Sequence, residues 1–279
     1  MLAAKIVFWV SLLVIFYSYI GYGILLWVLL KLKAVFSFNK GKMQEQQDFE
    51  PEVTLVIAAF NEAAFIQKKI ENSLALDYPA GKLKFLFVAD GSSDDTVNIL
   101  QQYPQVDLHY KPEREGKSMA INRVIPFVTT DFVVFSDANT LLNRDCIKAI
   151  IQHYKDPTIG AVAGEKVVSD ESGEAGIAGA GEGLYWKYES FLKKMDARFY
   201  SVVGAAGELF SIRTALFEPV QKHVLLDDFI ISMKICKKGY RVMYEPKAYA
   251  TEAPSFSLKE EQKRKIRISA GGWQSVFML

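Results

Sequence analysis

Asp137 and Asn139 stand one residue apart, after the apolar run Phe132 to Phe135 and the intervening Ser136. A carboxylate beside a second oxygen ligand suits Mg²⁺ or Mn²⁺, because such ions take few protein ligands when a diphosphate carries them. A helix cap or a turn uses the same residue types, so the pair alone leaves both interpretations open. We favour a metal site because polar residues also follow other apolar runs.

Two further groups end apolar runs in the same way. Asn61 and Glu62 follow the run at 53–59, and Asp90 follows the run at 84–89. Asp90 is expected to accept hydrogen bonds from the base or ribose of a nucleotide. A capped turn between strand and helix is the alternative interpretation of this ADGSSDDT segment.

Asp228 is the candidate general base, which would take a proton from an attacking hydroxyl. It opens a predicted helix, where capping and the helix dipole also favour an acid. Asp227 beside it would raise its proton affinity, because two neighbouring carboxylates resist ionising together.

Basic residues supply candidates for binding phosphate. Lys117, in REGKS, could neutralise phosphate charge, and a solvated lysine is the alternative. Arg264 and Arg267 lie in the basic segment 259–267, where guanidinium groups could clamp a diphosphate. The alternatives there are a solvated face or a helix lying on anionic lipid.

The elements that must position these side chains alternate between strand and helix. Apolar runs at 53–59, 84–89, 106–110 and 132–136 read as strands, and helical spacing or capping residues follow three of them. This alternation predicts an α/β fold with a mostly parallel sheet flanked by helices. Ligands of such sheets bind at the carboxyl ends of the strands, where these polar groups should meet. The glycine-rich stretch 173–183 is expected to be a flexible loop.

The N-terminal segment predicts a membrane anchor. No charged residue occurs from Ile6 to Leu30, and a helix of ~25 residues at ~1.5 Å per residue exceeds the ~30 Å hydrocarbon core. A signal peptide would have a shorter apolar region. Lys31 and Lys33 follow with Lys40 and Lys42, which favours a cytosolic location for what comes next. We expect an anchor at 1–33, a linker at 34–50 and a catalytic domain at 51–258. A basic interfacial helix is expected at 259–279, leading toward a further, truncated membrane segment.

Composition excludes other classes of function. The 279 residues carry a formal net charge of +1, which argues against a general nucleic-acid-binding protein. Two cysteines in apolar surroundings indicate reduced thiols rather than a disulfide framework. The three histidines lie far apart in the sequence, so a zinc site is not expected.

The order of the motifs resembles family 2 glycosyltransferases, which are membrane-associated inverting enzymes with a GT-A fold. The resemblance covers about residues 51–272. It is carried by six segments in order, which are VTLVIAAFNEA, ADGSSDDT, REGKSMAIN, FSDANT, LLDDFIISMKICKKGYRVMYEP and RKIRI.

The resemblance implies roles for residues of this sequence. Asp137 resembles the first acid of the metal-binding D-x-D motif, with Asn139 in place of the second acid. Asp228 resembles the catalytic base, with Asp227 where a Glu is often found. Donor-binding residues would be Ala58, Glu62, Asp90, Lys117, Asp137, Arg264 and Arg267. Asp227 and Glu208 would contact the acceptor. Ile268 stands where the Q/R-x-x-R-W motif of processive synthases has Trp.

The expected reaction is inverting transfer of a sugar from a nucleotide-diphospho-sugar to an acceptor hydroxyl. We expect the donor to be UDP-linked and the reaction to occur at the cytoplasmic face of the membrane. The acceptor would be a glycan or a lipid-linked sugar, with Mg²⁺ or Mn²⁺ as cofactor. One alternative is a nucleotidyltransferase, which would release diphosphate. Another is a non-catalytic partner of a membrane synthase that binds nucleotide sugar without turnover.

Overall fold

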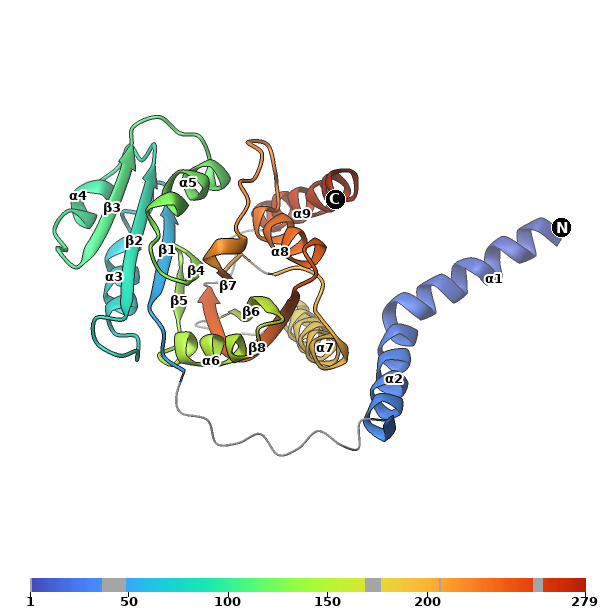
Figure 1. The fold of residues 1–279 in the computed structure, drawn as a ribbon. Helices are drawn as coiled ribbons and strands as arrows, with labels where there is room; N and C mark the ends of the chain where they lie inside the picture. Colours follow the sequence, from blue (N-terminus) through green and yellow to red (C-terminus); the bar gives the residue numbers. More distant parts are fainter. Residues whose placement is uncertain (1, 37–48, 169–176, 206, 253–257) are drawn as a thin grey trace.

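The computed structural model describes residues 2–36, 49–168, 177–205, 207–252 and 258–279. Its centre is a mixed sheet in the order β3-β2-β1-β4-β7-β6-β8-β5 (Figure 1). The strands are β1 (Val53–Ala59), β2 (Leu83–Asp90), β3 (Val106–Lys111), β4 (Phe132–Asp137), β5 (Thr140–Leu142), β6 (Ile159–Val168), β7 (Leu209–Arg213) and β8 (Arg241–Glu252). The expected α/β architecture is confirmed.

Strands β1 to β4 form a parallel half-sheet whose strand order reverses beside β1. The chain moves outward from β1 to β2 and β3, then returns to place β4 on the other side of β1. Ligands of open α/β sheets bind where the order reverses. Ala58 of β1 pairs in register with Asp137 of β4, so the carboxyl ends of the two strands are level at this point.

The other half of the sheet brings a distant segment to the same edge. β7 pairs antiparallel with β4 and β6, while β8 runs parallel to β6 and antiparallel to β5. Thr140, the first residue of β5, lies opposite Glu252, the last residue of β8. The end of β8 therefore arrives next to the turn that carries Asp137 and Asn139.

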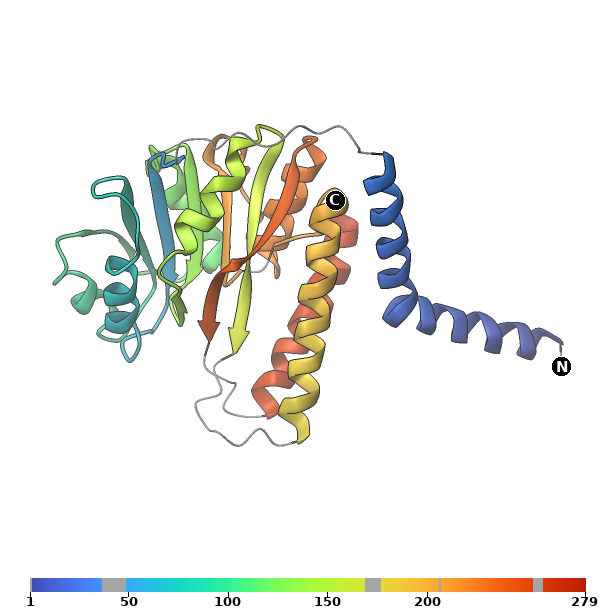
Figure 2. The ribbon, with the colours of Figure 1, turned by 90° about the horizontal axis from the view of Figure 1, so that it is seen from below.

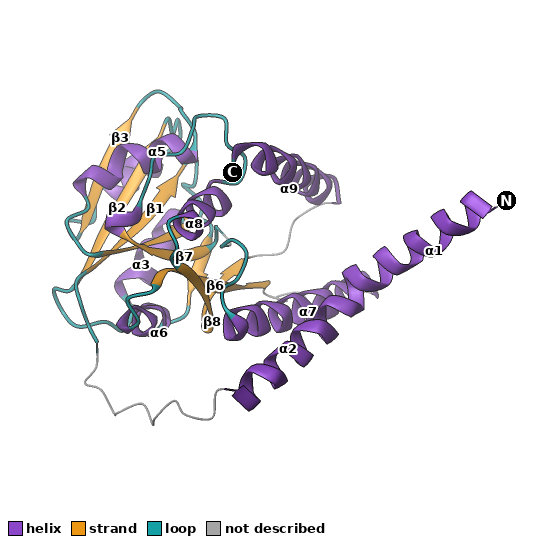
Figure 3. Cartoon of the chain, turned by 45° about the vertical axis from the view of Figure 1, so that its right-hand side comes forward, coloured by secondary structure: helices purple, strands orange, loops and turns teal. Residues whose placement is uncertain are grey.

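Helices cover both faces of the sheet. The helices are α1 (Leu2–Phe16), α2 (Tyr22–Phe36), α3 (Ile66–Leu74), α4 (Thr96–Leu100), α5 (Lys117–Val124), α6 (Cys146–Gln152), α7 (Ile177–Phe199), α8 (Asp227–Lys237) and α9 (Leu258–Met278). α3, α4 and α6 pack on one face, and α5 and α8 pack on the other. α9 lies beside α8 (Figures 1 and 3), where the Leu225 amide donates to Gln274 at 2.9 Å.

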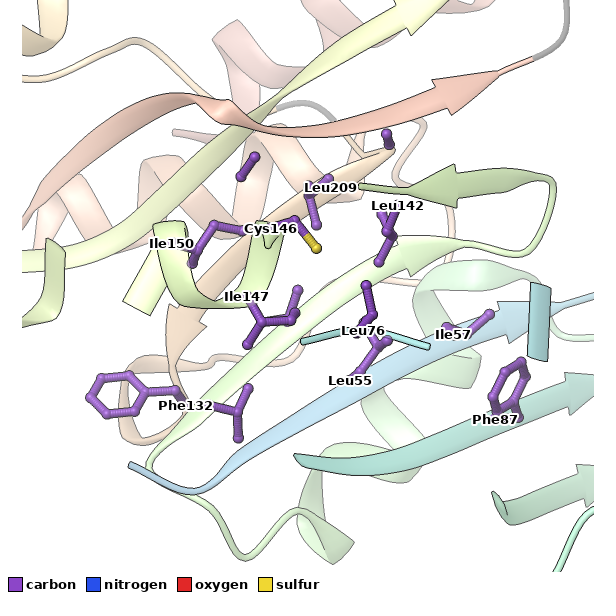
Figure 4. Close-up of a cluster of buried hydrophobic side chains, with 14 of the residues drawn as sticks. Leu55, Ile57, Leu76, Phe87, Phe132, Leu142, Cys146, Ile147, Ile150 and Leu209 are labelled. Atoms are coloured by element: carbon purple, nitrogen blue, oxygen red, sulfur yellow. The ribbon is translucent and has the colours of Figure 1, made fainter. Parts of the chain in front are cut away.

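Two apolar clusters follow from the alternation of side chains along the strands. Leu55 and Ile57 of β1 face α3 and α6 in one cluster, shown in Figure 4, while Val56 faces α5 and α8 in the other. β1 is therefore buried on both sides, as its mainly apolar sequence predicts. This burial makes the centre of the sheet a rigid support for the polar residues at its edge.

The N-terminal helices form one long apolar segment. A short π-helical turn at Tyr17–Gly21 joins α1 to α2, and α1 extends away from the sheet (Figures 1 and 2). Leu2–Val35 is long and apolar enough to cross a membrane, and only 11% of its most apolar window is buried. α2 lies along α7, where the Lys33 ammonium donates to the carbonyl of Arg198 at 3.0 Å. Most of the predicted linker, 37–48, lies outside the described residues.

The glycine-rich stretch differs from the prediction of a loop. α7 begins at Ile177 and includes the glycines at 179, 181 and 183, whereas 173–176 lies outside the described residues. The loop prediction was therefore wrong for 177–183. Glycine disfavours an isolated helix, but propensity is a weak guide over a long segment that continues into strongly helical residues.

Candidate active site

Asp137 and Lys117 form an ion pair at the carboxyl edge of the sheet. Asp137 ends β4, and its Oδ1 accepts from the Nζ of Lys117, with both side chains about one-third exposed. Lys117 is the first residue of α5 and follows Gly116, whose φ of 98° favours glycine. Burial lowers the pKa of Lys117, but the charges of Asp137, Asp227 and Asp228 more than offset it. The net shift of this pKa is upward, so the amine is firmly cationic.

Asp228 faces the same point from the start of α8. A methyl group built on Gly207 would lie 3.1 Å from Asp228 Oδ2 and 3.4 Å from Lys117 Nζ, so both groups border the backbone of Gly207. Burial and then the charge of Asp227 raise the pKa of Asp228 to about 7, although Lys117 acts in the opposite direction. A carboxylate with a near-neutral pKa is well matched to general base catalysis.

A polar pocket opens beside this cluster. Its volume is about 460 Å³, and it is lined by Asp137, Asn139, Glu208, Glu252, Lys263, Arg264 and Arg267. Five of these seven were predicted as site residues from the sequence, and they come from three separate segments. The structure therefore brings the predicted metal, acceptor and diphosphate groups to one cavity.

Salt bridges organise the carboxylates of the pocket. Glu208 Oε1 accepts from Arg264 Nη2 at 3.1 Å and from Lys166 Nζ at 2.9 Å. Lys166 also contacts Glu252, which lies 3.6 Å from Arg264 Nη1. Burial alone would raise the pKa of Glu208, but the charge of Lys166 and then that of Arg264 hold it below its usual value. Glu208 is therefore an ionised hydrogen-bond acceptor on the pocket wall.

Asp90 contacts the two residues just before Lys117 and does not line the pocket. Its Oδ2 accepts from the amides of Glu115 and Gly116 at 2.8 and 2.7 Å, and its Oδ1 accepts from Arg123 at 3.1 Å. These contacts place the start of α5 and hence Lys117. The expected role of Asp90 in binding the base or ribose stays a prediction, now with both carboxylate oxygens already held by the protein.

The loop after β1 is tied to the loop after β2. Asn61 has a φ of 53°, which is unusual for a residue other than glycine. Its Oδ1 accepts from the Ser93 amide at 2.8 Å, and the Glu62 amide donates to Thr96 Oγ1 at 2.8 Å. Burial, followed by the charge of Asp137, raises the pKa of Glu62. The charge of the Asp137 carboxylate therefore acts on Glu62, as expected if both residues lie at the carboxyl edge of the sheet.

Three residues of the site were not predicted from the sequence. Lys263 belongs to the basic segment that drew attention to its neighbours Arg264 and Arg267, so a signal was present. Glu252 and Lys166 had no such signal, because each ends or nearly ends an ordinary strand. Only the pairing of β8 with β5 and β6 brings Glu252 to the pocket and Lys166 into contact with Glu208 and Glu252 beside it.

The donor set fits a divalent ion carried on phosphate. Among the described residues, no three His, Cys, Asp or Glu side chains gather closely enough to hold a metal by themselves. Asp137 offers a carboxylate, and the amide nitrogen of Asn139 donates to Glu252 at 3.3 Å, which leaves its oxygen as the ligand atom. Two oxygen ligands suit an ion that completes its coordination with phosphate and water.

Comparison with known sequences gives a consistent family. A sequence model described as "Glycosyltransferase like family 2" matches residues 51–271. A poly-beta-1,6-N-acetyl-D-glucosamine synthase from Staphylococcus aureus is 28% identical over 234 residues, which cover 79% of this chain and 54% of that protein. The corresponding synthase from Staphylococcus epidermidis is 25% identical over 250 residues, which cover 84% of this chain and 58% of that protein. The chain spans about half the length of these curated relatives.

Solved structures share the fold. A mannosyltransferase from Pyrobaculum calidifontis, in complex with GDP-Man and Mn²⁺, aligns with a TM-score of 0.70 at 24% identity, covering 91% of this chain and 71% of that chain. Staphylococcus aureus TarS in complex with UDP-GlcNAc aligns with a TM-score of 0.57 at 14% identity. The alignment covers 73% of this chain and 59% of the TarS chain. The expected GT-A-like arrangement of sheet and helices is therefore shared with glycosyltransferases of known structure.

Proposed function

The chain belongs to glycosyltransferase-like family 2, and we propose that it is an inverting enzyme that moves a sugar from a nucleotide-diphospho-sugar to an acceptor hydroxyl. One observation carries this proposal: Asp228, with its near-neutral pKa, borders the same glycine as Lys117, and Lys117 pairs with Asp137 at the pocket. A base, a phosphate-binding cation and a metal ligand are thus adjacent, as a displacement at a sugar carbon needs.

In the proposed reaction, Asp228 accepts the proton of the acceptor hydroxyl while its oxygen attacks the anomeric carbon. The bond between that carbon and the diphosphate oxygen breaks on the opposite face, so the configuration inverts. Lys117 and Arg264 stabilise the negative charge that grows on the leaving diphosphate. Asp137 and Asn139 would hold a Mg²⁺ or Mn²⁺ ion, which supplies further charge stabilisation to that diphosphate when bound.

The donor is proposed to be UDP-linked, with a hexose or N-acetylhexosamine as the sugar. The synthase named for the curated relatives and the UDP-GlcNAc bound to TarS support this choice. The GDP-Man bound to the Pyrobaculum enzyme is the competing precedent. The acceptor is proposed to be a growing glycan or a lipid-linked sugar.

The proposed location is the cytoplasmic face of a membrane. The apolar segment Leu2–Val35 supports an anchor, and the lysines after it favour a cytosolic catalytic domain. On α9, Trp273, Val276 and Phe277 are at least 70% exposed. These side chains follow the basic segment that contributes Arg264, which supports the proposed interfacial helix at 259–279.

A binding panel followed by an assay of released product tests the proposal. We expect UDP-GlcNAc or UDP-glucose to raise the melting temperature of the protein in Mn²⁺ but not in EDTA, with GDP-mannose as the comparison. A ligand at 100 times its Kd adds ~2.7 kcal/mol of stability. An unchanged shift in EDTA would contradict the metal site. Release of UDP supports transfer, whereas release of diphosphate would indicate a nucleotidyltransferase, and binding without release would indicate a non-catalytic partner.

A further inference from the structure

Lys69 is a buried lysine that the proposed mechanism does not use. It lies on α3, and its side chain is completely shielded from solvent (0% exposed). Burying an ammonium group is costly, and an apolar side chain would fill the same space without that cost. Burial lowers the pKa of Lys69 to about 7, although the charge of Asp137 acts in the opposite direction. Core packing alone therefore does not account for a lysine here.

The Lys69 ammonium joins the two ends of the turn that carries Asp137 and Asn139. Its Nζ donates to Ser136 Oγ at 2.7 Å and to the Thr140 carbonyl at 2.9 Å. Ser136 immediately precedes Asp137, and Thr140 immediately follows Asn139. One lysine side chain thus holds both ends of the three-residue turn 137–139.

The same contact extends to the wall of the pocket. Because Ser136 Oγ accepts from Lys69, its own proton can be donated elsewhere, and the nearest acceptor is the Glu208 carbonyl at 3.1 Å. Glu208 precedes β7, and its carboxylate lines the pocket. Lys69, Ser136 and Glu208 therefore form a continuous link between α3, the end of β4 and the start of β7.

We propose that Lys69 is a positioning residue, which fixes the turn at Asp137–Asn139 and the backbone of Glu208 in the arrangement that receives the donor diphosphate and its divalent ion. The inference rests on the proposed function, because it assigns Lys69 a role at that same site. Lys69 touches neither donor nor acceptor. It acts through Ser136 and Thr140, as an outer-shell partner acts on a metal ligand.

The test measures Mn²⁺ affinity by paramagnetic resonance titration of the full chain, with saturating UDP and, in parallel, GDP. Lys69→Met keeps an unbranched side chain, one atom shorter than lysine, and removes its hydrogen bonds. Loss of an outer-shell partner weakens metal binding by ~10- to 100-fold. We expect a loss in that range for Lys69→Met, a matching rise in donor KM, and a smaller fall in kcat.

Thr54→Val is the matched control. Thr54 and Thr130 form another buried polar pair, 2.8 Å apart, at the opposite end of β1 and β4. Removing this pair should lower the melting temperature and leave Mn²⁺ affinity unchanged. If Mn²⁺ affinity fell equally in Thr54→Val and Lys69→Met, the effect would be general destabilisation and the proposal would be overturned.

Ser136→Ala decides the question if Lys69→Met does not fold. It removes the acceptor for Lys69 and the donor to Glu208 but leaves the ammonium in place. A loss of Mn²⁺ affinity comparable to that expected for Lys69→Met supports the proposal, and unchanged affinity overturns it. Absence of nucleotide-dependent Mn²⁺ binding in the unsubstituted protein would instead overturn the proposed function itself, and this inference with it.

Discussion

At the scale of single residues, the proposed role of Asp228 as general base depends on the charges around its carboxyl group. Burial and Asp227 keep this carboxyl protonated to a higher pH than usual, while Lys117 limits the effect. An ordinary surface aspartate would be ionised but would have little tendency to take a proton. The balance between burial, Asp227 and Lys117 leaves Asp228 with a near-neutral pKa, which suits its proposed role as general base.

Asp228→Asn should abolish most of the transfer while leaving donor binding intact. A general base contributes ~10²- to 10⁴-fold to the rate, so we expect kcat to fall within that range. Thermal shift with nucleotide sugar and Mn²⁺ reports donor binding separately. Asp107→Asn is the control, because Asp107 lies on β3 with its side chain 67% exposed. Loss of donor binding in Asp228→Asn would count against the base role.

The pKa of Asp228 also predicts how activity and stability depend on pH. Because the carboxylate must be ionised to act as base, kcat/KM for the acceptor should rise with pH through about 7. Asp227→Asn removes the second-largest cause of the raised pKa, so its inflection should lie at lower pH. An inflection unmoved by Asp227→Asn would show that another group sets the profile.

The stability of the fold should fall with rising pH over the same range in which activity rises. A carboxyl whose pKa is raised by folding binds more protons in the native state than in the unfolded state. It therefore lowers stability as pH rises from its ordinary value near 4 to about 7. Asp228→Asn should melt at a higher temperature than the unsubstituted protein at pH 8, and the difference should shrink at pH 5. Melts without metal or nucleotide check this, and equal melting temperatures at both pH values would contradict it.

At the scale of elements, the site is assembled from the ends of β4, α5 and α8. Asp90 accepts from the two amides before α5 and thereby holds the first turn of that helix. Gly207, just before β7, lets Asp228 and Lys117 approach the backbone closely. The geometry of the cluster therefore depends on where these elements begin and end.

Gly207→Ala tests this close approach. The added methyl group would lie 3.1 Å from Asp228 Oδ2, which is tighter than ordinary contact, so Asp228 must shift. Small displacements of catalytic groups can cost ~10²-fold in rate, and we expect a loss of ~10- to 100-fold with the fold retained. Gly272→Ala is the control, because nothing lies within 4 Å of a methyl group there. Normal activity in Gly207→Ala would show that the cluster tolerates the shift.

At the scale of the whole molecule, the catalytic part is attached to an apolar helix that it does not bury. α2 contacts α7, but α1 extends away from the sheet (Figure 2). Residues of α1 such as Leu13 are exposed, at 66% in that case. A bilayer would cover this surface, as the proposed membrane anchor requires.

Lysines placed in the middle of α1 should release the protein from membranes. A lysine at the centre of a spanning helix costs ~2.5–3.5 kcal/mol, so we expect Val10→Lys with Leu13→Lys to shift the full chain into the soluble fraction on alkaline carbonate extraction. Val203→Lys is the control. Val203 is also an exposed apolar residue (72%), but it lies outside the N-terminal apolar segment. Unchanged retention of the double variant would contradict a spanning role for α1.

Local patterns in the sequence were enough to predict the buried strands of this protein and the polar residues beyond their ends. Buried strands such as β1 show mainly apolar runs, and polar residues beyond their ends mark where the runs stop. The carboxyl edge could be predicted because parallel strands place equivalent ends together. The same reasoning led to Asp137 and Asn139, and the basic segment 259–267 led to Arg264. The three residues line one pocket.

The tertiary structure alone decided the rest, because no local pattern encodes a contact between distant segments. Glu252 reaches Asn139 across 113 positions through the pairing of β8 with β5. Lys69 looks in the sequence like a solvated helix lysine, yet the face of α3 that carries it packs against the sheet. Which face of a helix is buried, and which strand ends meet, depend on packing between elements, and that packing exists only in the folded chain.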